Sequence, residues 1–191
     1  HKGKSMKKIL LLLCLTIIFV SGIFAQDDDM KKWMDYMTPA KEHQGLAKLN
    51  GDWTYTSKMW MDPSAEPQTS SGTAKFEMLL GNRYSQMKVY GKMMGMDFEG
   101  IGVTGYDNAA KKYYSTWVDN LGTGIMLMEG VYDEATKKFV YFGKYNDPMT
   151  GGVSTMKETI KIIDDNTFDM EMFSVIDGKE VKNMEMHCTR K

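Results

Sequence analysis

Methionine pairs are the residues in this chain whose type and spacing come nearest to a chemical function. The sequence holds 19 methionines. Five pairs have one residue between their members: Met59 and Met61, Met94 and Met96, Met126 and Met128, Met170 and Met172, and Met184 and Met186. On a β-strand this spacing puts both thioethers on one face. Thioethers are soft ligands that suit Cu(I), but flexible methionines also fill cores and line cavities that accept irregular ligands. Because pairs spread over five strands need not converge, the pattern favours a core or a cavity over a metal site.

His187 is the other candidate for metal chemistry. Some ten-stranded barrels of the nitrobindin type hold haem iron through a histidine near their C-terminus. On a strand, however, His187 has the opposite parity to Cys188 and Arg190, and it shares its face with the polar residues Asn183 and Glu185. We therefore expect a surface histidine and no cofactor, with copper at Met94 and Met96 or haem at His187 as the alternatives.

Enzymatic motifs are absent from the sequence. It contains no Gly-x-Ser-x-Gly elbow, no His-Glu-x-x-His pair and no phosphate-cradling glycine loop. After residue 25 the chain has two histidines, His43 and His187. The absence of a catalytic constellation favours a noncatalytic protein over an enzyme.

Residues 1–25 have the pattern of a secretory signal. Met6, Lys7 and Lys8 precede an apolar run over residues 9–20, and small residues follow up to Ala25. The run is shorter than the roughly 20 residues that a spanning helix needs. The sequence therefore predicts export to the periplasm or the extracellular space after cleavage near Ala25, and no stable membrane anchor afterwards.

Cleavage at that point would change both charge and cysteine content. Removing four lysines and no acidic residue from a net charge of −1 leaves −5. An acidic domain without basic runs gains nothing from the field of a polyanion, so nucleic acid is not an expected partner. Cys14 would leave with the signal, and Cys188 alone cannot form an intramolecular disulfide. The oligomeric state has no signature in the sequence.

The elements that must position these residues divide the remaining chain in two. Residues 26–50 form a helical segment: apolar residues recur at helical spacing from Met30 to Met37, Thr38 and Pro39 begin a second helix, and His43, Leu46 and Leu49 share one of its faces. From residue 51 the period changes to two, and turn residues recur at short intervals. The predicted strands lie near 52–61, 72–80, 83–91, 95–106, 112–119, 124–132, 138–146, 153–163, 166–176 and 179–190.

Trp53 and Arg190 suggest how these strands close. Gly51-x-Trp53 on the first strand, with a basic residue on the last, resembles the lipocalin-type signature of calycin barrels, in which a guanidinium from the final strand covers the indole. The resemblance implies one closed antiparallel β-barrel of about ten strands over residues 51–191, after a short helical segment. If Trp53 points inward, so do its neighbours of like parity. The cavity candidates are Trp53, Tyr55, Met59, Met61, Trp117, Asp119, Met184, Met186 and Arg190.

A second resemblance spans nearly the whole chain after the signal. Its blocks are Lys58-Met59-Trp60-Met61-Asp62-Pro63, Gly105-Tyr106-Asp107-Asn108, Thr116-Trp117-Val118-Asp119-Asn120, Gly122-Thr123-Gly124, Asp147-Pro148-Met149-Thr150-Gly151 and Thr189-Arg190-Lys191. They resemble the bacterial family called domain of unknown function 1579, whose members are mostly exported single-domain proteins without an assigned activity. The sequence thus predicts an exported calycin-like barrel that binds a small hydrophobic or amphipathic ligand. The alternatives are a copper or haem protein and a solid structural or interaction module.

Overall fold

The computed structural model describes residues 27–191, so the expected signal segment 1–25 lies outside it. The described residues divide into two units, which meet between Thr38 and Pro39. The first unit contains a helix over residues 27–37, and within it Lys32 pairs with Asp28 and Asp29. Across residues 27–191 no helix has the length and apolar character needed to cross a membrane.

The second unit, over the described residues Pro39–Lys191, contains one short helix and ten strands. The helix is α2 (Lys41–Ala47). The strands are β1 (Gly51–Met59), β2 (Gln68–Leu79), β3 (Tyr84–Met93), β4 (Met96–Asp107), β5 (Lys112–Asp119), β6 (Met126–Asp133), β7 (Lys138–Asn146), β8 (Val153–Asp164), β9 (Thr167–Ile176) and β10 (Lys179–Arg190). Each lies within a few residues of its predicted span.

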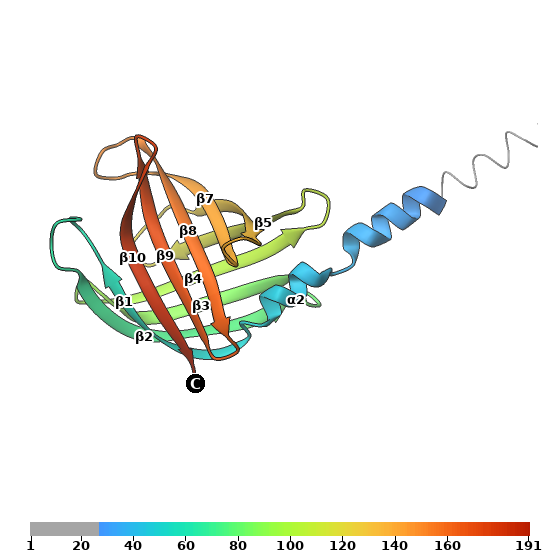
Figure 1. Cartoon of the computed structure of the whole chain (residues 1–191), viewed down its shortest axis with the longest axis horizontal. Helices are drawn as coiled ribbons and strands as arrows, with labels where there is room; N and C mark the ends of the chain where they lie inside the picture. The colour runs from blue at the N-terminus through green and yellow to red at the C-terminus, as the bar shows by residue number, and fades with distance from the viewer. Residues whose placement is uncertain (1–26) are drawn as a thin grey trace, which may run out of the picture. The chain divides into compact units, whose positions relative to one another are not determined.

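The ten strands form one closed antiparallel barrel (Figure 1). Each strand pairs with its neighbours in sequence, and β1 pairs with β10 to close the circle, with Trp53 opposite Arg190 and Met59 opposite Met184. Closure leaves no strand edge unpaired. The predicted all-β, calycin-like barrel of about ten strands is confirmed.

Helix α2 packs at one end of the barrel, against β3 and β4. It begins two residues later than expected, because the backbone N–H of Ala40 donates to Nδ1 of His43 at 2.9 Å and so caps the first turn. His43, Leu46 and Leu49 are all buried, as their shared face predicts. Burial also lowers the pKa of His43, which therefore caps the helix as a neutral ring.

Inward-facing side chains are buried near α2 and partly exposed at the other end. On β1, Trp53 and Tyr55 are buried, whereas Ser57 and Met59 are not. The same gradient runs along β10, where Cys188 is buried and Met184 is partly exposed. Inward-facing side chains therefore pack closely at the α2 end, which we call the closed end, and leave accessible space at the opposite, open end.

Candidate ligand-binding site

Side chains of the open half bound a hollow that we call the lumen. Strand alternation from buried residues such as Trp53 and Tyr141 identifies which residues face it. They include Ser57, Met59, Ser70, Trp117, Met156, Glu158, Met172, Ser174, Met184 and Met186, all partly exposed although they point into the barrel. Space inside the barrel therefore reaches these side chains.

Methionines form one continuous wall of the lumen. Met184 on β10 lies opposite Met59 on β1 and opposite Met172 on β9. One step nearer the closed end, Met186 lies opposite Met170. Residues directly opposite one another on antiparallel strands have Cβ atoms roughly 5 Å apart, so these thioethers are neighbours. The sequence analysis did not anticipate this convergence, because it depends on which strands pair.

An aromatic wall faces the methionine wall. In a ring of ten strands, β4 and β5 lie opposite β9 and β10. The Trp117 indole of β5 lies flat over Gly100 and Gly102 of β4, where an added Cβ at Gly100 would come within 2.2 Å of the ring. Trp117 Nε1 donates to the Asp119 carboxylate at 2.9 Å, and the same carboxylate accepts the backbone N–H of Leu121. Asp119 therefore fixes the indole and the following loop.

A few hydroxyl groups supply hydrogen-bonding positions in the lumen. Ser57 and Ser70 share a hydrogen bond of 2.7 Å between β1 and β2, and Thr104 and Ser115 share one of 3.0 Å between β4 and β5. Apolar walls with a few placed polar groups are typical of small-molecule sites.

Glu158 is the charged group of the lumen that the sequence analysis missed. On β8 it lies opposite Tyr141 and Met172, which both face inward, while the adjacent Thr159 points outward and bonds to Glu171. Burial raises the pKa of Glu158 to about 7. The side chain is nevertheless partly exposed, so it borders the hollow. Within the described residues no hydrogen bond or ion pair reaches its carboxyl group.

Tyr141 stays neutral beside Glu158. Its ring is buried against Tyr113 and Phe139, and burial, together with the nearby Glu158 carboxylate, holds its pKa well above the ordinary value. Its hydroxyl therefore remains a hydrogen-bond donor and acceptor across the working pH range.

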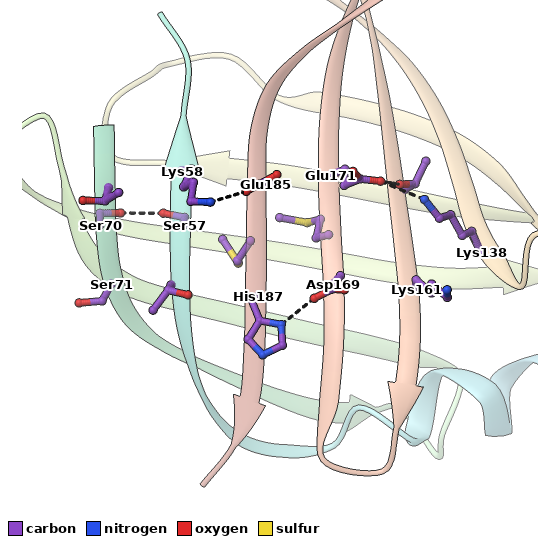
Figure 2. Close-up of a pocket in the computed structure, with 15 residues that line it drawn as sticks. Ser57, Lys58, Ser70, Ser71, Lys138, Lys161, Asp169, Glu171, Glu185 and His187 are labelled. Atoms are coloured by element: carbon purple, nitrogen blue, oxygen red, sulfur yellow. Dashed lines mark hydrogen bonds and ion pairs between the residues drawn. The ribbon is translucent and has the colours of Figure 1, made fainter. Parts of the chain in front are cut away.

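A second depression, of about 840 Å³, is lined mainly by outward-facing side chains of β1, β2, β7, β8, β9 and β10 (Figure 2). It also touches the inward-facing Ser57, Ser70, Met170 and Met186. Its charged side chains are largely paired with one another: Lys58 with Glu185 at 3.0 Å, His187 with Asp169 at 2.7 Å and Lys138 with Glu171 at 2.9 Å. Figure 2 shows the first two pairs joining neighbouring strands, whereas the Lys138–Glu171 pair joins β7 to β9 across β8. Because these charged side chains already neutralise one another, the outer depression offers few free charges to a ligand. The lumen is therefore the stronger candidate for a ligand site.

The structure places the predicted cavity residues in three groups. Met59, Trp117, Asp119, Met184 and Met186 lie on the inner face of the open half. Trp53, Tyr55 and Arg190 lie at the closed end, where the Arg190 guanidinium covers the Trp53 ring at 4.3 Å. Met61 follows the end of β1 and is 70% exposed, so it does not line the lumen; the strand ends two residues earlier than alternation suggested.

The metal candidates lie in a hairpin and on the outer face of β10. Met94 and Met96 are exposed in the β3–β4 hairpin, where Met94 takes the positive φ of 52°. His187 lies on the outer face of β10, paired with Asp169. The parity argument for an outward His187 agrees with this position.

The closed meander, the indole–guanidinium seal and the hollow open half define a calycin-like β-barrel. The chain belongs to the DUF1579 family of proteins of unknown function, whose model matches residues 38–190. No curated protein matches it.

Two of the solved structures that are similar to this chain are a phycobiliprotein lyase and a redesigned β-barrel. The S-type phycobiliprotein lyase CPES from Guillardia theta has a TM-score of 0.58 at 11% identity, over 83% of this chain and 96% of that one. A redesigned β-barrel has a TM-score of 0.40 at 15% identity, over 76% of this chain and 94% of that one. At 11% identity, the similarity between this chain and the lyase shows that the two proteins share a fold.

Proposed function

We propose that this protein binds a small hydrophobic or amphipathic molecule in the lumen and does not transform it. The observation that carries the proposal is the partial exposure of inward-facing methionines and Trp117 in a barrel whose other half buries its inward-facing side chains. An apolar ligand between the two facing apolar walls would be buried on both sides. This burial is worth about 25 cal/mol per Å² of apolar surface removed from water. The solved neighbour named a phycobiliprotein lyase supports a small-molecule role for such a barrel.

A fluorescent apolar probe tests this proposal. N-phenyl-1-naphthylamine should bind the purified protein saturably at about one equivalent. Met172→Trp adds bulk inside the lumen and should weaken binding at least fivefold. Phe142→Trp installs the same residue on the exposed outer face of β7 and should leave binding unchanged. Absence of saturable binding, or equal binding by both variants, would contradict the proposal. Native mass spectrometry of protein from its own host would then identify a copurifying ligand.

Copper(I) binding is a second candidate, favoured by one observation. Register brings Met59, Met172 and Met184 side by side, which supplies three neighbouring soft ligands. Competition with bicinchoninate should then give one Cu(I) per chain, lost in the triple Met→Leu variant of these residues. Met149→Leu, at a 90% exposed position, is the control. No Cu(I) uptake in competition would eliminate this candidate.

Export completes the proposed function. The signal pattern of residues 1–25 supports delivery to the periplasm or beyond. N-terminal sequencing of protein isolated from the periplasm or medium should begin near Gln26. Protein that keeps Met6 and stays in the cytoplasm would contradict export.

A further inference from the structure

Glu158 sets the chemical class of the ligand, and this inference rests on the proposed lumenal binding function. Several acidic side chains of the barrel wall have a cationic partner. Glu171, on the adjacent strand, contacts both Lys138 and Lys182, and Glu185 contacts both Lys58 and Lys182. Those pairs lie on the outer face. The inward carboxylate at Glu158 has no such partner within residues 27–191.

Each strand packed against Glu158 presents a neutral group to it. Tyr141 faces it from β7 and Met172 from β9, and Met156 and Ile160 flank it on β8. The titratable groups nearest by this arrangement are Tyr141 and Tyr113, and burial raises the pKa of both phenols, so both are neutral. Cys188, deeper in the barrel, is also neutral, since burial raises its pKa to about 12.

An unpaired carboxylate held largely out of water is costly unless something compensates it. A bound cation would compensate it, and the adjoining methionine wall would take an apolar chain attached to that cation. We propose that the lumen binds an amphipathic amine, with its ammonium group ion-paired to the Glu158 carboxylate and its apolar body between the methionine wall and Trp117.

Binding of this kind depends on pH in a defined direction. The ammonium pairs with the ionised form of Glu158, and its own proton stays bound because alkyl amines have pKa values of about 10. A Glu158 pKa near 7 leaves the carboxyl mostly ionised at pH 8 and mostly protonated at pH 5.5. Affinity for the amine should therefore fall about tenfold or more between these two pH values.

Three decyl compounds separate charge from apolar contact. Isothermal titration at pH 8 should show decylammonium binding the wild-type protein at least tenfold more tightly than decanol, and decanoate binding most weakly. Glu158→Gln keeps the shape of the side chain and should reduce the preference for the amine over the alcohol to about threefold or less. Glu129→Gln removes an exposed, outward carboxylate on β6 and should keep the full preference.

The outcomes distinguish this inference from the function on which it rests. Equal affinity for decylammonium and decanol, or a preference that survives Glu158→Gln, would overturn the ammonium site while leaving lumenal binding intact. An amine affinity that does not change between pH 5.5 and pH 8 would also overturn it. If N-phenyl-1-naphthylamine and all three decyl compounds fail to bind the wild-type protein, the proposed function itself fails.

Discussion

The guanidinium of Arg190, the penultimate residue, lies 4.3 Å from the centre of the Trp53 ring on the first strand. Its nitrogens also donate to three backbone carbonyls, those of Asp165, Asn50 and Lys48. One side chain thus joins the last strand, the β8–β9 turn and the segment between α2 and β1. The barrel is closed by hydrogen bonds between β1 and β10, and Arg190 seals the closed end below them.

Replacing Arg190 should cost more stability than replacing an exposed charged residue at the C-terminus would. Arg190→Ala removes the stacking on Trp53 and leaves three carbonyls without their donor, which together are worth about 3 kcal/mol in the free energy of unfolding. Arg190→Lys keeps the charge but not the planar fork of donors, and should recover less than half of that loss. Urea unfolding measures both. Lys191→Ala is the matched control, and a loss in Arg190→Ala no larger than in this control would contradict the sealing role.

Gly100 should be intolerant of any side chain because Trp117 occupies the space. A Cβ at this position would come within 2.2 Å of the indole, so Gly100→Ala must push the ring off β4 and weaken its bond to Asp119. We expect a loss of about 1–3 kcal/mol, as for other overpacked cores, and a changed near-ultraviolet circular dichroism spectrum of tryptophan. Gly124→Ala, where nothing lies within 4 Å, should change neither quantity. An unchanged spectrum in Gly100→Ala would contradict this packing.

Much of the barrel could be predicted from the sequence because antiparallel strands carry their own signal. Residues with alternating polarity and side chains that stabilise turns, such as Asp107, locate strands and hairpins without knowledge of distant contacts. The Trp53–Arg190 pair also revealed which strands must close the barrel. Met61 shows the limit of the argument, because alternation alone does not reveal where a strand stops.

The lumen could be predicted only in part, because it depends on register. Strand parity correctly puts Met184 and Met186 inside, but whether they meet Met172 and Met170 depends on pairing between strands. Glu158 did leave a signal in the sequence. It is an acidic residue in the middle of an otherwise apolar face, between Met156 and Ile160, where a solvent-exposed strand would place its acids on the other face.

Glu171 should stabilise the barrel at neutral pH and lose that effect in acid. Hydrogen bonds from Lys182 and Lys138 lower its pKa to about 2, below the value of 4.5 expected in the unfolded chain. Its stabilising contribution is therefore complete above pH 4.5 and disappears as the pH falls toward 2. Glu171→Gln should cost about 1–2 kcal/mol at pH 7, with the difference from wild type shrinking below pH 4. Urea unfolding at pH 7 and pH 3 checks this. Glu134→Gln, in an exposed turn, is the control.

Glu158 should show the opposite dependence, because its pKa is raised and not lowered. The folded protein holds the proton up to about pH 7, whereas the unfolded chain releases it near 4.5. Between those values the folded state binds more protons, so its stability falls as the pH rises, and the full penalty is present above pH 7.

Glu158→Gln removes that penalty without changing the shape of the side chain. We expect the free energy of unfolding of the variant to exceed that of the wild type by about 2 kcal/mol at pH 8 and to equal it at pH 4. Urea unfolding of the ligand-free protein measures both values. A saturating amine should erase the difference at pH 8, because an ion pair compensates the wild-type carboxylate and the amide gains nothing. A variant less stable than wild type at pH 8 without ligand would show that Glu158 already has a partner in the folded protein.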